Sequence, residues 1–150
     1  MNTRSQQKLS FRVSRPDSWT VLMVDDHPLL REGVKAVVAA EPNPPRWLEA
    51  NHLEDARRLL QGEHPDVLIL DLFLPTSTGD SPSGLELLRH LPELSPQTHT
   101  LVLSYESDLK WVRICERLGA LGYLTKSESP EALIPALQAI RRGETYYSSA

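Results

Sequence analysis

The sequence of 150 residues predicts one α/β domain, a doubly wound parallel sheet of five strands with helices on both faces. Three observations predict this fold. Five short apolar runs alternate with segments of helical periodicity, which is the pattern of repeated strand–helix units. The clearest runs contain no polar residue, as expected for strands buried on both faces. Four of the runs end at a polar or charged side chain, where a ligand site is expected in such sheets.

The N-terminal half of the domain contains two strand–helix units. The predicted strand, helix, weak strand and helix cover, in order, residues 20–24, 28–40, 47–48 and 53–61. Pro28 suits the first turn of the first helix, because it lacks only an amide that the helix would leave unpaired. The proline-rich segment 41–45 ends this helix.

The C-terminal half contains three more units. The predicted strands cover residues 67–70, 100–103 and 122–125, and the helices that follow them cover about 84–91, 108–118 and 130–142. A polar loop over residues 75–83 follows the first of these strands. Pro130 favours the start of the last helix, and Gly143 favours its end.

The strand order determines which residues meet. Right-handed crossovers place the C-terminal ends of all five strands at the same edge of the sheet. The flavodoxin-like order 2-1-3-4-5 brings the first and third strands side by side, with the fourth and fifth next to them. The polar residues that follow these four strands are then expected to meet in one crevice: Asp25, Asp26, Asp71, Ser104 and Lys126.

This group of side chains predicts phosphoryl chemistry with a divalent cation. Three carboxylates at one edge repel one another, and a cation relieves that repulsion. Oxygen ligands without nearby cysteine or clustered histidine favour Mg²⁺, with Mn²⁺ as an alternative, over zinc. Asp71 would be the nucleophile, while Ser104 and Lys126 would neutralise the transferring group. The sequence contains no GxxxxGK[ST] or GxGxxG segment, which argues against two other phosphate sites.

Each of these residues also has a purely structural explanation. Asp25 and Asp26 could cap the helix that begins at Pro28, and Ser104 could be another cap. Asp71 could be a turn residue and Lys126 a solvated charge. The histidines show no metal-ligand spacing and are predicted to be surface or capping residues: His27, His52, His64, His90 and His99.

Composition and charge limit the class of protein. No apolar run approaches the ~20 residues of a membrane helix. The N-terminus contains no apolar block of a signal peptide, and one cysteine, Cys115, cannot form a disulfide framework, so we expect a cytoplasmic protein. Residues 1–16 carry four basic and no acidic side chains. The remainder has 12 basic against 20 acidic side chains, a poor surface for nucleic acid.

Four segments resemble the receiver domains of two-component response regulators: VLMVDDHPLLREGV, DVLILDLFLP, LVLSYES and GALGYLTKS. DDHP and GALGYLTK resemble the NarL/FixJ-type subfamily in particular. The resemblance covers about residues 20–145. It implies a receiver domain over 19–145, after a disordered basic leader over 1–18 and before the start of a linker over 146–150.

The resemblance also implies roles for the residues at the strand ends. Asp71 would accept a phosphoryl group from the phosphohistidine of a sensor histidine kinase. Asp25 and Asp26 would hold Mg²⁺ together with Asp71 and the backbone carbonyl of Phe73. Lys126 would pair with the phosphoryl oxygens. The chain would then be a signalling phosphoacceptor, with self-catalysed phosphotransfer and autodephosphorylation as its only enzymatic activities.

A conformational switch and an output surface are implied as well. Ser104 would move towards the phosphoryl group, and Tyr123 would turn inward with it. The output surface would be formed by helix four, strand five and helix five, around residues 107–142, and would make a homodimer. Trp111 and Ile114 lie three residues apart on helix four, and the sequence leaves open whether they form a dimer contact or belong to the core.

The sequence departs from the family pattern at one loop and leaves other functions open. Eight residues separate Pro75 from Gly84, where about three are usual, and this insertion is either neutral surface variation or a change in access to Asp71. Members of the subfamily usually continue into a helix-turn-helix domain, to which we assign DNA binding. The alternatives are a stand-alone receiver, a binding module that signals without phosphorylation and a Mg²⁺-dependent hydrolase.

Overall fold

The computed structural model describes residues 18–75 and 81–147. The predicted basic leader, apart from its last residue, lies outside the described residues, as does most of the insertion that precedes Gly84. In the described ranges, no helix combines the length and the apolar character needed to span a membrane.

The sheet is parallel and has six strands in the order β2-β1-β3-β4-β5-β6. The strands are β1 (Thr20–Val24), β2 (Arg46–Ala50), β3 (Val67–Leu70), β4 (His99–Ser104), β5 (Gly122–Thr125) and β6 (Tyr146–Tyr147). The predicted fold class and the predicted order of the first five strands are confirmed. The sixth strand was not predicted and extends the sheet beyond β5.

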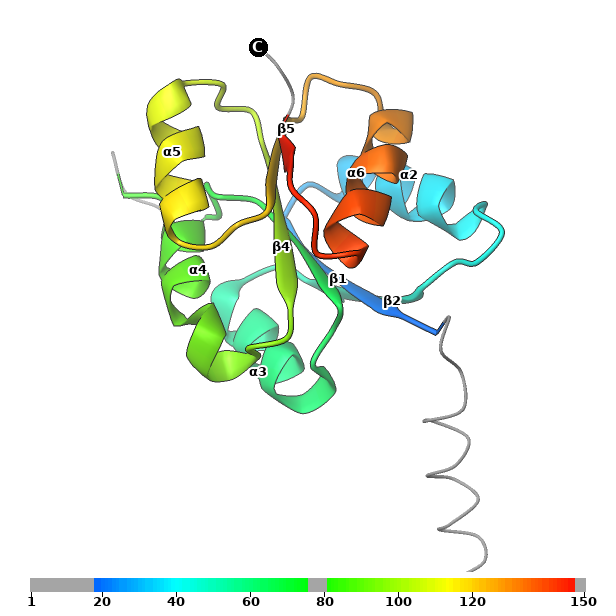
Figure 1. The fold of residues 1–150 in the computed structure, drawn as a ribbon, viewed down its shortest axis with the longest axis horizontal. Helices are drawn as coiled ribbons and strands as arrows, with labels where there is room; N and C mark the ends of the chain where they lie inside the picture. Colours follow the sequence, from blue (N-terminus) through cyan, green and yellow to red (C-terminus); the bar gives the residue numbers. More distant parts are fainter. Residues whose placement is uncertain (1–17, 76–80, 148–150) are drawn as a thin grey trace, which may run out of the picture.

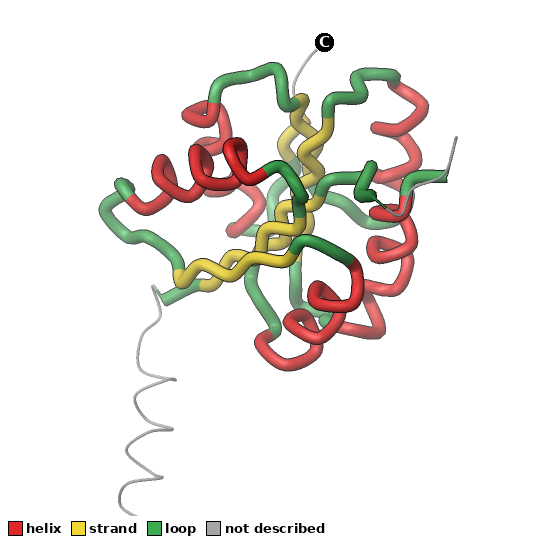
Figure 2. Tube along the Cα trace, turned by 180° about the vertical axis from the view of Figure 1, so that it is seen from behind, coloured by secondary structure: helices red, strands yellow, loops and turns green. Residues whose placement is uncertain are grey.

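Helices cover both faces of the sheet. They are α2 (Pro28–Ala39), α3 (Leu53–Glu63), α4 (Ser83–Leu94), α5 (Leu109–Arg117) and α6 (Leu133–Arg141), which continues from the 3₁₀ helix η1 (Pro130–Ala132). Helices α2 and α6 lie on one side of the sheet, and α3, α4 and α5 lie on the other (Figure 1). The view from behind shows the same division into layers (Figure 2). Helices α2, α3, α4 and α5 begin within one residue of the predicted positions, whereas the start predicted at Pro130 is that of η1, and α6 begins three residues later.

The core consists of two apolar layers, one on each face of the sheet. In β1, Leu22 and Val24 pack towards α3, α4 and α5, whereas Val21 and Met23 pack towards α2 and α6. All four side chains are fully buried. Burying an apolar side chain of this size contributes about 1.5–3 kcal/mol to folding, so each position of the strand favours an apolar residue. This is the physical reason for the uninterrupted apolar runs.

Trp111 belongs to the core. It is buried, and its ring meets that of Phe73 edge to face at a centroid distance of 5.6 Å. Ile114 is partly buried against the same apolar layer. Of the two possibilities that the sequence left open, core packing is therefore the one observed for Trp111.

Strand β6 is formed by residues that the sequence analysis assigned to the start of a linker. The amide of Tyr146 donates to the carbonyl of Leu121 at 2.8 Å, and the Tyr147 hydroxyl donates to the carbonyl of Ala120 at 2.6 Å. A Cβ atom at Gly122 would lie only 2.5 Å from the Tyr146 carbonyl oxygen, so the close approach of β6 requires glycine there. The last described residues, Tyr146 and Tyr147, therefore belong to the sheet and lie next to β5 (Figure 1).

Candidate functional site

The strand register brings Asp25 and Asp71 together. Val24 of β1 lies opposite Leu70 of β3, and the two aspartates directly follow these last strand residues. The Asp71 amide donates to the carbonyl of Val24 at 3.0 Å, which extends this pairing by one residue. The exposed fractions of Asp25 and Asp71 are only 1% and 3%. Two carboxylates thus lie side by side at the C-terminal edge of the sheet, in a largely buried position.

Lys126 lies between these carboxylates. Its Nζ atom is 2.7 Å from Asp25 Oδ2 and 3.0 Å from Asp71 Oδ2, and its side chain is fully buried. The backbone amide of Lys126 donates to the carbonyl of Ser104 at 2.8 Å, so the ends of β4 and β5 are joined at this point. The alternative explanation of Lys126 as a solvated surface charge is therefore excluded. Its ammonium group is the internal counter-charge of the two aspartates.

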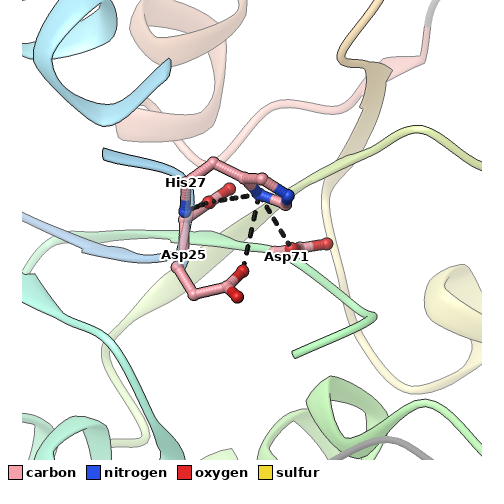
Figure 3. Close-up of side chains that lie close together, drawn as sticks. Asp25, His27 and Asp71 are labelled. Atoms are coloured by element: carbon pink, nitrogen blue, oxygen red, sulfur yellow. Dashed lines mark hydrogen bonds and ion pairs between the residues drawn. The ribbon is translucent and has the colours of Figure 1, made fainter. Parts of the chain in front are cut away.

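His27 is an exposed residue at the N-cap position of α2, as predicted, but its ring also lies next to the carboxylates, which was not predicted. Its Nδ1 atom lies 2.9 Å from Asp25 Oδ1 and 3.9 Å from Asp71 Oδ2 (Figure 3). The same atom lies 3.5 Å from Asp26 Oδ1 and 3.0 Å from Lys126 Nζ. The ring can donate to Asp25 or accept from Lys126 through Nδ1, depending on the tautomer. His27 occupies the N-cap position of α2 but makes no side-chain cap hydrogen bond. The sequence feature that could have indicated these contacts is the position of His27 directly after Asp26.

The carboxylates fit a divalent cation. Asp25, Asp26, His27 and Asp71 each offer one ligand atom, and these atoms lie within 4.8 Å of one another. Asp26 Oδ1 is buried and accepts no hydrogen bond from the described residues, although His27 Nδ1 lies 3.5 Å from it. An unpaired buried carboxylate oxygen is unfavourable, and a bound cation would satisfy it. The oxygen-rich ligand set suits Mg²⁺ or Mn²⁺. The helix-capping alternative for Asp25 and Asp26 is not observed, because neither occupies the N-cap of α2.

An open cavity of about 320 Å³ adjoins Asp71. Its lining residues come from the ends of β1, β3 and β4: His27, Asp71, Phe73, Ser104, Tyr105 and Glu106. The Phe73 amide donates to Asp71 Oδ1 at 3.2 Å. Tyr105, which the sequence analysis did not select, is largely exposed, and its ring centre lies 5.2 Å from Lys126 Nζ. The cavity gives a small reactant access to Asp71.

Ser104 and Tyr123 both contact the backbone of Glu106. The Ser104 hydroxyl oxygen accepts from the Glu106 amide at 3.2 Å, and the Tyr123 hydroxyl donates to the Glu106 carbonyl at 2.6 Å. The Tyr123 side chain is buried. Burial also raises the pKa of Tyr123 to about 12, which keeps the hydroxyl protonated as a donor.

Known proteins match the chain over most of its length. The family of response regulator receiver domains matches residues 21–138. The chain belongs to this family. This receiver domain is 35% identical over 138 residues to the nitrate/nitrite response regulator protein NarL of Escherichia coli (strain K12), covering 92% of the chain and 62% of NarL. It is 34% identical over 126 residues to the transcriptional regulatory protein DegU of Brevibacillus brevis, covering 84% of the chain and 51% of DegU.

Solved structures agree with this assignment. A LuxR family two-component response regulator from Aurantimonas sp. SI85-9A1 superposes with a TM-score of 0.76 at 29% identity, over 86% of this chain and 89% of that one. The predicted resemblance to NarL/FixJ-type receivers is confirmed. The receiver domain spans between half and two thirds of the length of NarL and DegU. Receiver domains are signalling modules rather than typical enzymes; they bind Mg²⁺ in an acidic pocket and interact with sensor histidine kinases.

The surroundings of Asp71 disfavour its charge. Burial raises the pKa of Asp71 above its ordinary value of 3.8, and the nearby Asp25 carboxylate raises it further. Lys126 and the Phe73 amide lower the pKa but do not fully compensate. A carboxyl group whose pKa is higher in the folded than in the unfolded protein destabilises the fold once it ionises. The charged form of Asp71 is therefore less favourable in the folded, ion-free receiver domain than in the unfolded chain.

We expect Asp71→Asn to raise the melting temperature of the ion-free domain at pH 7. The neutral amide avoids the unfavourable charge, while Lys126 keeps its 2.7 Å contact with Asp25. The gain should shrink as the pH falls towards 4, because wild-type Asp71 then takes up a proton. Mg²⁺ at several to some tens of times its Kd should stabilise wild type by about 1–2 kcal/mol, and the variant by less.

Thermal unfolding with and without Mg²⁺ measures both effects. Asp55→Asn on α3 is the matched control, because Asp55 pairs with Arg58 at the surface and should leave the response to Mg²⁺ unchanged. A less stable Asp71→Asn variant with an unchanged Mg²⁺ response would contradict this description of the site.

Proposed function

We propose that this receiver domain accepts a phosphoryl group on Asp71 from the phosphohistidine of a sensor histidine kinase, and thereby switches the association of a cytoplasmic transcription regulator. The observation that carries the proposal is the environment of Asp71. Its carboxylate is buried, lies 3.0 Å from the Lys126 ammonium and adjoins both the open cavity and the ligands for a divalent cation. A carboxylate nucleophile beside fixed positive charge is what phosphoryl transfer requires.

Mg²⁺ is the proposed cofactor, with Mn²⁺ as an alternative. The carboxylates of Asp25, Asp26 and Asp71, with the backbone carbonyl of Phe73, would hold it. When bound, the ion supplies positive charge that neutralises the phosphoryl oxygens. The buried Asp26 Oδ1 atom supports this assignment, because it accepts no hydrogen bond from the described residues and a cation would satisfy it.

In the proposed transfer, a carboxylate oxygen of Asp71 attacks phosphorus and forms an acyl phosphate. The P–N bond of the donor phosphohistidine breaks, its electron pair stays on the imidazole, and the imidazole takes up a proton. Lys126 pairs with one phosphoryl oxygen, and the Ser104 hydroxyl donates to another. Autodephosphorylation is the attack of water on the same phosphorus through the cavity, which returns the Asp71 carboxylate and inorganic phosphate.

The proposed output is a change at the face formed by α5, β5 and α6. Ser104 and Tyr123 meet at the Glu106 backbone, so a movement of Ser104 towards the phosphoryl group would reposition the loop before α5. Strand β6 extends this face beyond the edge of β5. We assign homodimerisation to this face. We assign regulation of transcription to the protein as a whole and DNA binding to a part of it outside this receiver domain, since relatives of this chain are named transcriptional regulatory proteins.

Intact mass after incubation with acetyl phosphate and Mg²⁺ tests the proposal. Wild type and the control Asp55→Asn should gain one phosphoryl group, and Asp71→Asn should gain none, because an amide is not a nucleophile here. A gain in Asp71→Asn equal to that of wild type would move the acceptor to another residue. No gain in any of the three proteins would favour a binding module of the same fold that signals without phosphorylation.

A further inference from the structure

Arg31 of α2 reaches behind the turn that carries Asp25 and Asp26. Its NH1 group donates to the backbone carbonyl of Asp25 at 2.6 Å and also contacts the side chain of Asn51. Its Nε atom lies 3.4 Å from Glu49 Oε1. Only 14% of the Arg31 side chain is exposed. One guanidinium group thus connects the C-terminal ends of β1 and β2.

The contact with Asp25 fixes a particular peptide bond. The Asp25 carbonyl and the Asp26 amide belong to the same planar peptide unit, so a bond to one restricts the other. Regular pairing of β1 with β2 ends at Val24 and Ala50. Beyond that point the Asp25 amide still donates to the Ala50 carbonyl at 3.1 Å, while Arg31 donates to the Asp25 carbonyl. Arg31 therefore continues the restraint of the sheet by one residue.

The Asp25 side chain also restrains this turn. The Asp25 Oδ1 atom accepts from the His27 amide at 2.7 Å. Asp26 Oδ1 accepts no hydrogen bond from the described residues, and its contact with His27 Nδ1 is longer, at 3.5 Å. The direction of the Asp26 carboxylate thus depends on its backbone, and the backbone is fixed by Arg31 on one side and by Asp25 on the other.

We propose that Arg31 is a positioning residue for the divalent cation site. It fixes the peptide between Asp25 and Asp26, so that both carboxylates are in place before the ion binds. The inference rests on the proposed Mg²⁺ site, to which it adds a residue that does not touch the ion. Groups that orient metal ligands in this way commonly affect metal affinity about 10–100-fold.

Because Arg31 is positively charged, its effect through charge and its effect through the backbone restraint can be distinguished. A cationic guanidinium beside an acidic site repels an incoming Mg²⁺ ion, so its removal should strengthen binding if charge were its only effect. Loss of the restraint on the Asp25–Asp26 peptide should weaken binding. If charge repulsion dominates, a neutral residue in place of Arg31 should strengthen Mg²⁺ binding. If the restraint on the peptide dominates, the same substitution should weaken Mg²⁺ binding.

The experiment measures Mn²⁺ binding by electron paramagnetic resonance of the free ion, with Mg²⁺ as competitor, at fixed ionic strength. Arg31→Met should bind Mn²⁺ about 10-fold more weakly or worse. Arg31→Lys keeps the charge but replaces the planar guanidinium, with its several donors, by a single ammonium group. This variant should also bind Mn²⁺ more weakly than wild type. The matched control is Arg57→Met, which removes a cation that pairs with Glu86 at the surface of α3. Its affinity should equal that of wild type.

Circular dichroism and the melting temperature establish that each variant is folded. A folded Arg31→Met variant that binds Mn²⁺ as tightly as wild type, or more tightly, would overturn the inference. Should Arg31→Met not fold, an unchanged affinity of Arg31→Lys would overturn it equally. Wild type that binds no Mn²⁺, or binds it as well after Asp26→Asn, would instead refute the proposed metal site itself, and the role of Arg31 with it.

Discussion

Replacing Lys126 by methionine is expected to lower the free energy of unfolding of the ion-free domain by about 3–5 kcal/mol. Methionine fills a similar volume but has no charge. The substitution leaves Asp25 and Asp71 side by side in a buried position without the ammonium group that lies 2.7 and 3.0 Å from them. Removing one partner of a buried ion pair is costly because the remaining charges stay desolvated.

The effect should depend on both Mg²⁺ and pH. An ion bound by the carboxylates would replace part of the lost positive charge, so Mg²⁺ should stabilise Lys126→Met more than wild type. Lys126 lowers the pKa of Asp71, and its loss should raise that pKa further. A raised pKa in the folded state destabilises at neutral pH and less so as the carboxyl group takes up its proton. The difference in stability from wild type should therefore narrow as the pH falls from neutral towards the ordinary carboxyl pKa of 3.8.

Urea or thermal unfolding without Mg²⁺ measures the predicted loss. Lys35→Met is the matched control, since Lys35 lies exposed on α2 and its replacement should change stability by no more than about 0.5 kcal/mol. An ion-free Lys126→Met variant as stable as wild type would show that the two aspartates do not need the ammonium group. They would then share a proton or lie farther apart than in this structure.

The sheet and its site were predictable because both depend on simple rules. Buried strands need apolar residues on both faces, so the apolar run Val67–Leu70 predicts a strand with the bounds that are observed. Parallel strands end at one edge, so Asp71 and Lys126 meet although 55 residues separate them. No fine detail of packing is needed for either conclusion.

Other features depend on details that the sequence does not express. Strand β6 has two residues, too few for any hydrophobic period, and its pairing depends on the space above Gly122. His27 reaches the carboxylates through the direction of its side chain, which residue spacing cannot give. The Phe73 carbonyl, expected among the Mg²⁺ ligands, stays a prediction, while the Phe73 amide is seen to donate to Asp71.

The importance of Gly84 also emerges only from the fold. We expect Gly84→Ala to lower the stability of the domain strongly. Gly84 lies in the first turn of α4, and its amide donates to the Leu72 carbonyl at 2.8 Å. A Cβ atom at this position would lie 2.5 Å from the Asp71 carbonyl oxygen and 2.7 Å from Leu72 Cα. Both obstacles are backbone atoms, so either α4 or the segment after β3 has to move. Such overpacking costs about 1–3 kcal/mol or more.

Gly62→Ala provides the opposite expectation for the same chemical change. Gly62 lies in α3, and a Cβ atom there meets nothing within 4 Å. Alanine loses less conformational entropy than glycine in a helix, so this variant should be as stable as wild type or more stable, by up to about 1 kcal/mol. Urea unfolding of the two variants and wild type gives the comparison. Equal stability of Gly84→Ala and wild type would contradict the close packing of α4 on the Asp71 backbone.

The clash at Gly84 also has a consequence for the site, because one of the displaced atoms belongs to Asp71 itself. Any shift of the Asp71 and Leu72 backbone changes the position of the Asp71 carboxylate relative to Lys126, which is held independently at the end of β5. Gly84→Ala should therefore take up phosphoryl groups from acetyl phosphate more slowly than wild type, even where it remains folded. Gly62→Ala, which leaves this backbone in place, should react at the wild-type rate. A slow reaction in both variants would point to a general effect of stability, whereas a slow reaction in Gly84→Ala alone would show that the packing of α4 positions the phosphoacceptor.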